Sequence, residues 1–176
     1  KLNDYNFSAL SARTAADVDL AIPSAQFTAA RLKKDVLNSS SIGLTAVDKS
    51  WSTGYSRSLS GDFLINPGEA WQITGQFVVS APGLSIAHSA YFLRVAHESN
   101  LHHIHLRYSD TGEKLKDNVN QTGFIRDDDM RELDSDLSYF FWPQSSALKY
   151  IFIESRNNIF WSHAGMLRSW YVTETA

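Results

Sequence analysis

The chain has 176 residues, of which 43% are apolar and 20% are charged, and its 16 basic and 19 acidic side chains give a net charge of −3. These values indicate one globular domain with a packed core, and they argue against a nucleic-acid partner because phosphate binding needs a basic patch. The absence of cysteine excludes disulfides, and the apolar runs are far shorter than the roughly 20 residues of a membrane-spanning helix, so no membrane insertion is expected.

The first fifty residues are predicted to form a lead-in segment that packs on the main domain, residues 51–176. The small and polar stretch from Ser8 to Ala16 is typical of a linker or a short edge strand. From Ala25 to Leu37 the apolar residues loosely follow a 3.6-residue period, which predicts a short helix.

From Phe63 onward the apolar residues recur at every second position, which predicts β-strands. The clearest strand runs from Glu69 to Ser80 and follows the turn Asn66-Pro67-Gly68. Further strands are predicted at Ser89 to His97, Leu101 to Tyr108, Leu148 to Glu154, Ile159 to Trp161 and Met166 to Thr173. With no crossover helix between them, these strands predict an all-β fold, an antiparallel sandwich of two sheets. Its predicted core contains Trp71, Ile73, Phe77, Val79, Leu93, Val95, Ile104 and Leu106.

The alternation places a second, polar set of side chains on the opposite face of the same strands. This set consists of Gln72, Thr74, Gln76, Phe92, Arg94, His103, His105 and Arg107. If the strands are neighbours, these residues form a polar, partly aromatic groove suited to a glycan, where Arg94 and Arg107 hold carboxylates or hydroxyls and Phe92 stacks on a sugar ring. Trp142 and Trp161 stand beside loop residues and are two further candidate platforms for sugar rings.

Histidines and acids raise the question of a metal site. His103 and His105 would point the same way on a strand, about 7 Å apart, as a pair of metal ligands can. The remaining ligands cannot be placed, so the preferred interpretation is a metal-free polar face. The acidic run could bind calcium, but it lacks the spacing of an EF-hand loop and is interpreted as a solvated loop. That run comprises Asp127, Asp128, Asp129, Glu132, Asp134 and Asp136.

The sequence contains no Gly-x-Ser-x-Gly elbow, phosphate-binding glycine loop or dinucleotide fingerprint, and no catalytic residue is assigned. His103 and Arg107, with Tyr91 or Tyr139, could abstract a proton in polysaccharide elimination. The alternation, however, puts Tyr91 on the face opposite His103.

The segment from Gly61 to Gly75, with Pro67-Gly68-Glu69 and Trp71, resembles the jelly-roll carbohydrate-binding modules of bacterial glycosidases, phage tail fibres and tailspikes. The strand Ala147 to Ile153, a polar turn at Asn157-Asn158 and the closing strand Trp170 to Glu174 resemble the last strands of these modules. The resemblance implies a non-catalytic module that binds bacterial surface polysaccharide, in an extracellular or virion-associated protein, with a homotrimer as the expected assembly. Two alternatives stay open, namely a trimerisation or structural cap of a fibre, and a small polysaccharide lyase or hydrolase.

Overall fold

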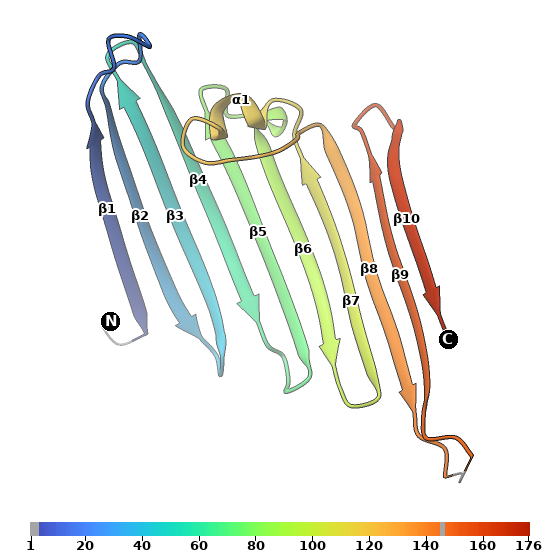
Figure 1. Cartoon of the computed structure of the whole chain (residues 1–176). Coiled ribbons are helices and arrows are strands. Elements are labelled where there is room, and N and C mark those ends of the chain that lie inside the picture. Colours follow the sequence, from blue (N-terminus) through green and yellow to red (C-terminus); the bar gives the residue numbers. More distant parts are fainter. Residues whose placement is uncertain (1–3, 145–146) are drawn as a thin grey trace.

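The computed structural model describes residues 4–144 and 147–176, in which ten strands form one antiparallel sheet (Figure 1). Each strand pairs with the next strand along the chain, so the order in the sheet equals the order in the sequence. The strands are β1 (Tyr5–Thr14), β2 (Ala25–Val36), β3 (Ser40–Trp51), β4 (Gly54–Ile65), β5 (Trp71–Ala81), β6 (Ser89–Glu98), β7 (His102–Thr111), β8 (Met130–Phe141), β9 (Ile151–Trp161) and β10 (Leu167–Thr175). A single 3-10 turn, η1 (Ile86–His88), and one short helix, α1 (Leu115–Val119), complete the described part. No helix in residues 4–144 or 147–176 is long and apolar enough to cross a membrane.

The prediction of an all-β fold is confirmed, but the predicted two-sheet sandwich, and with it the jelly roll, is wrong. The described residues form one open sheet, and no second sheet packs on it. A jelly roll requires connections that cross from one sheet to the other, whereas here every strand turns back beside its predecessor. Alternation shows that a strand has an apolar side, but it does not show what covers that side.

The predicted helix at Ala25 to Leu37 is also wrong, because this segment is strand β2. Strand β3 pairs with it along its whole length, from Ala25 opposite Trp51 to Val36 opposite Ser40, and β1 pairs with it from Ala25 to Lys34. Pairing on both sides satisfies the backbone of β2 and outweighs the weak helical preference of its alanines, leucine and lysines. Strands β1 to β3, from the predicted lead-in segment, thus lie in the same sheet as β4.

Two further expectations near the C-terminus differ from the structure. The acidic run was expected to be a solvated loop, but from Met130 onward it is strand β8, in which Glu132, Asp134 and Asp136 point to one face. The expected turn at Asn157-Asn158 is likewise wrong, since both residues lie inside strand β9 and pair with β8 and β10. Most of these charged and amide side chains are accommodated because they lie on the face of the sheet that also carries Arg107 and Arg156.

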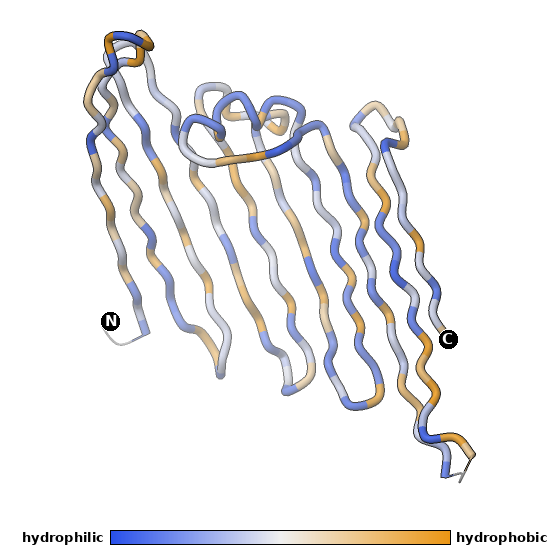
Figure 2. Tube along the Cα trace, in the orientation of Figure 1, coloured by the Kyte–Doolittle hydropathy of each residue, from blue (hydrophilic) through white to orange (hydrophobic). Residues whose placement is uncertain are grey.

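The sheet has two different faces. The apolar face carries a row of paired residues that crosses all ten strands: Tyr5, Lys34, Ile42, Phe63, Gly75, Leu93, Tyr108, Leu133, Ile159 and Trp170. The polar face carries the neighbouring row: Asp35, Ser41, Leu64, Thr74, Arg94, Arg107, Asp134, Asn158 and Tyr171. Figure 2 shows the resulting alternation of hydrophobic and hydrophilic positions along the strands.

The residues predicted as core do share the apolar face, but they are not buried. Phe77 is 50% exposed and Leu93 is 48% exposed, and in the described part of the chain only Ala25, Ala96 and Leu115 are buried apolar residues. Side chains on this face nevertheless pack against side chains and backbone of the adjacent strands. Gly75 provides the clearest case, because a Cβ atom there would lie 2.6 Å from the Phe63 ring, so only glycine lets that ring lie across the neighbouring strand.

Helix α1 covers one end of the polar face, above β4 and β5 (Figure 1). The Ser56 hydroxyl on β4 donates a hydrogen bond to the Asn118 carbonyl at 2.7 Å, and the Asn118 amide donates to the Pro82 carbonyl at 2.7 Å. Leu115, at 1% exposure, anchors the helix beneath these bonds. Among the described residues, the polar face is therefore covered at this end of β4 and β5 and uncovered along the rest of these strands.

Candidate functional site

The polar face of β5, β6 and β7 brings together most of the residues predicted to bind a glycan. Gln76 lies opposite Phe92, and Arg94 lies opposite Arg107. The residues that share this face are Gln72, Thr74, Gln76, Phe92, Arg94, His103, His105 and Arg107. The predicted common face is confirmed, while their contact with a ligand stays a prediction.

The two candidate tryptophans do not join this group. Trp161 lies opposite Arg131 and on the apolar face, where its ring centroid is 6.3 Å from that of Tyr108. Trp142 follows the end of β8 and stacks on Phe140 with ring centroids 5.7 Å apart. The loop residues beside both tryptophans suggested exposure. Trp142 is 49% exposed, whereas the register of β9 places Trp161 on the apolar face.

Two arginines lie side by side at the centre of the polar face. Arg107 donates from Nη2 to the Glu132 carboxylate at 2.6 Å, whereas Arg94 donates from Nη1 to the side-chain oxygen of Gln72 at 3.3 Å. Within the described part of the chain Arg94 has no carboxylate partner, and its Nε is buried without a hydrogen-bond partner. Like charges directly opposite each other repel, so an anion between the two guanidinium groups would be stabilised.

A hollow of about 180 Å³ lies next to this arginine pair. Phe92 is half-buried in its wall, and polar groups surround the ring. These lining residues are Gln76, Arg107, Ser109 and Thr111. An apolar ring bordered by amide, hydroxyl and guanidinium groups is the combination that binds the C–H face and the hydroxyls of a sugar.

The four neighbouring histidines are divided between the two faces. On the polar face, His103 Nδ1 lies 2.6 Å from Glu98 and His105 Nε2 lies 3.5 Å from Asp134. On the apolar face, the His97 and His102 rings stack 4.6 Å apart. Among residues 4–144 and 147–176 no group of three or more histidine or acidic side chains is arranged to hold a metal ion.

An ion-pair network on the polar face was not predicted from the sequence. Glu132, only 7% exposed, accepts hydrogen bonds from Arg107, from Ser109 at 2.9 Å and from Asn158 at 3.0 Å. Further pairs on this face include Arg31 with Asp62 at 2.7 Å and Arg156 with Asp136 at 3.0 Å. These partners are far apart in the sequence, so only the strand register reveals them.

Several buried polar atoms of this face have no hydrogen-bond partner. They include Nε of Arg107, Nε2 of His105 and Oδ1 of Asn158, in addition to Nε of Arg94. His105 and Arg107 lie 3.5 and 4.0 Å from Asp134, which is within ion-pair range but does not provide a well-formed hydrogen bond. These atoms have almost no accessible surface, so a ligand could reach them only if the neighbouring side chains moved.

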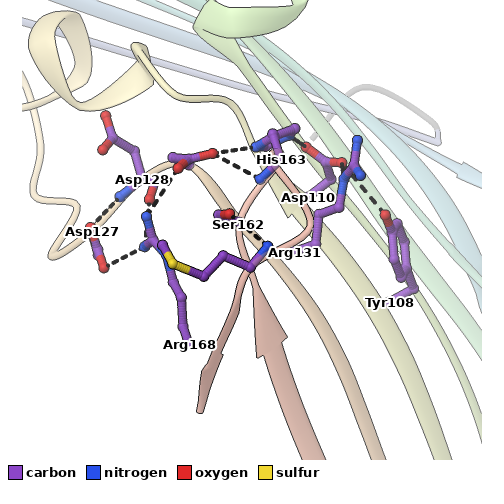
Figure 3. A network of polar contacts seen from close by, with 10 residues as sticks. Tyr108, Asp110, Asp127, Asp128, Arg131, Ser162, His163 and Arg168 are labelled. Atoms are coloured by element: carbon purple, nitrogen blue, oxygen red, sulfur yellow. Dashed lines mark hydrogen bonds and ion pairs between the residues drawn. The ribbon is translucent and has the colours of Figure 1, made fainter.

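A second cluster of hydrogen bonds and ion pairs connects the loops at the α1 end of the sheet (Figure 3). The His163 ring lies 2.9 Å from Asp129 through Nδ1 and 2.9 Å from Asp110 through Nε2. Arg168 binds Asp129 and Asp127, at 3.1 and 3.0 Å. Hydrogen bonds from the His163 backbone N–H and ring hold the pKa of Asp129 below its usual value. This cluster joins the β9–β10 turn to β7 and to the loop before β8. Asp127 and Asp129 belong to the acidic run first considered for calcium.

The set of residues considered for polysaccharide elimination is not assembled. His103 and Arg107 share the polar face, but Tyr91 lies opposite Asp110 and Tyr139 lies opposite His102, both on the apolar face. The residues gathered on the polar face can donate and accept hydrogen bonds, hold an anion and stack on a ring. Comparison with protein-family models, curated proteins and solved structures gives no match for this chain.

Proposed function

We propose that the polar face of β5 to β7 binds an acidic glycan without converting it chemically. The observation that carries this proposal is the pair Arg94 and Arg107, of which only Arg107 has a carboxylate partner, beside the half-buried ring of Phe92. A uronate or another acidic substituent would lie between the guanidinium groups, while the sugar ring stacks on Phe92.

The polar groups around the two arginines support a hydroxyl-rich ligand rather than a simple anion. Gln72 and Gln76 offer both donors and acceptors, and Ser109 offers a hydroxyl. A single site of this size binds weakly, so display of several copies would raise the overall affinity.

Replacing Arg94 by glutamine is expected to weaken binding of an acidic trisaccharide, trigalacturonate, by about tenfold, because one charge-assisted hydrogen bond contributes roughly 1.5–3 kcal/mol. Phe92→Ala is expected to weaken binding of both the acidic and a neutral trisaccharide, because it removes the stacking surface. Isothermal titration calorimetry measures both affinities.

Arg126→Gln is the matched control, since Arg126 is exposed in the loop before β8 and does not line the hollow beside Phe92. It removes the same charge and is expected to leave both affinities unchanged. Equal binding by the Arg94→Gln, Phe92→Ala and control variants would show that glycans do not use this groove.

A further inference from the structure

We propose that the apolar face of the sheet lies against the acyl chains of a lipid bilayer, with the polar face turned to water. This inference rests on the apolar face alone and does not depend on glycan binding. Of the ten residues in the row that crosses every strand, only Lys34 is charged. Water-soluble monomers rarely expose a continuous apolar surface larger than a few hundred Å². A side of ten strands without a covering layer therefore needs an apolar partner.

The positions of the charged residues on the apolar face favour lipid over a protein partner. All of them lie within four residues of a strand end: Arg13, Lys34, Asp48, Arg57, Asp110, Arg131 and Glu174. Most of these groups near the α1 end are paired, Arg57 with Asp48 at 2.5 Å and Arg131 with Asp110 at 3.0 Å. A charge-free central band with charges at both borders matches the layers of a bilayer. A protein interface instead has a polar rim around a compact apolar centre.

The length of the strands fits the same partner. The strands contain nine to twelve residues. A tilted strand of about 9–11 residues is long enough to cross the hydrocarbon layer, which is roughly 30 Å thick. The strands thus match the thickness of the layer without any helix of membrane-spanning length.

Aromatic rings with a polar atom mark both ends of the apolar face. Tyr55, at the start of β4, and Trp161, at the end of β9, lie at the α1 end. Trp71, at the start of β5, and Tyr139, near the end of β8, lie at the other end. Tyrosine and tryptophan concentrate where a membrane meets water, because their rings are apolar and their tips form hydrogen bonds.

The two edge strands, β1 and β10, each have one side without a paired strand. Backbone N–H and C=O groups without partners cost several kcal/mol each in hydrocarbon. The inference therefore includes pairing of both edges by strands of further copies of this chain in the membrane-bound state. It also makes the polar face, with Arg94 and Arg107, the side that lines water.

The test is flotation of the purified chain with phosphatidylcholine vesicles, comparing two arginine substitutions at paired strands. Leu93→Arg places a charge in the middle of the apolar face and is expected to lower the vesicle-bound fraction at least tenfold. Gln76→Arg places the same charge on the polar face of the adjacent strand and is expected to bind vesicles like the unmodified chain. Equal flotation of the two variants would overturn the proposal.

A second measurement does not depend on how the variants fold. Trp71, Trp161 and Trp170 lie on the apolar face, so lipids brominated on the acyl chain are expected to quench the tryptophan fluorescence of the unmodified chain strongly. Absence of quenching, or self-association of the chain in place of vesicle binding, would assign the apolar face to a second copy and overturn the lipid proposal. Quenching in vesicles that bind no trigalacturonate would refute glycan binding and leave this inference intact.

Discussion

The Glu132→Ala variant is expected to lower the free energy of unfolding by about 1–3 kcal/mol, because it leaves hydrogen-bond donors without their shared acceptor. Glu132 is nearly buried, and its carboxylate is the common acceptor for Arg107 and Ser109 on β7 and for Asn158 on β9. Removing the carboxylate leaves three donors, on the two strands that flank β8, without their acceptor. The loss is measured by denaturant unfolding of the purified chain.

Two variants separate the charge from the general effect of substitution. Glu132→Gln keeps an acceptor for Asn158 or Ser109 and is expected to cost less than the alanine variant. Glu113→Ala alters an exposed glutamate and is expected to change the free energy by less than about 0.5 kcal/mol. Similar stabilities of Glu132→Ala and Glu113→Ala would mean that the carboxylate does not stabilise the β7–β8–β9 region.

The Leu115→Ala variant is expected to destabilise the α1 end of the sheet by about 2–5 kcal/mol, the usual cost of truncating a buried leucine. Leu115 is 1% exposed and is the only large apolar side chain fully buried in residues 4–144 and 147–176. Its loss removes the anchor under α1, so the bonds from Ser56 and Asn118 should open. Hydrogen exchange should rise first in α1 and in the adjoining ends of β4 and β5.

Leu84→Ala is the matched control, because Leu84 lies in the loop between β5 and β6 and is 71% exposed. The same chemical change there is expected to leave the stability within about 0.5 kcal/mol of the unmodified chain. If the two leucine variants were equally stable, α1 would not be anchored by the side chain of Leu115.

The local part of this fold can be predicted from the sequence. Alternation identified the strands that became β5, β6 and β7 and divided their residues correctly between two faces, with Ile73 on one and Arg94 on the other. The division holds because side chains of a strand point alternately to opposite sides whatever the rest of the fold does. The alternation therefore predicted that the candidate glycan residues of β5 to β7 share one face, and the strand register confirms it.

The number of layers could not be predicted in this way. Alternating residues such as Leu93 and Leu106 were assigned to a core because an apolar side usually packs on a second layer, yet both are 48% exposed in the single sheet. No membrane insertion was expected because no continuous apolar run reaches the length of a membrane-spanning helix. A strand presents an apolar side with only every second residue apolar, so that criterion does not apply to a sheet.

The long-range ion pairs could not be predicted from the sequence either. Glu132 and Arg107 are separated by 25 residues, and Arg31 and Asp62 by 31 residues. Their pairing depends on the register of every strand between them, which a local pattern does not specify. The acids of β8 therefore resembled a solvated run, although their arginine partners lie on adjacent strands.

The most direct test of the two-faced sheet is a spin-label scan along β6 in phosphatidylcholine vesicles, from Tyr91 to Val95. The chain has no cysteine, so each position can be labelled through a single introduced cysteine. Labels at positions 91, 93 and 95 should collide preferentially with oxygen, which dissolves in hydrocarbon, and labels at 92 and 94 with a water-soluble nickel complex. Uniform collision rates along all five positions would contradict a sheet with one face in lipid and the other in water.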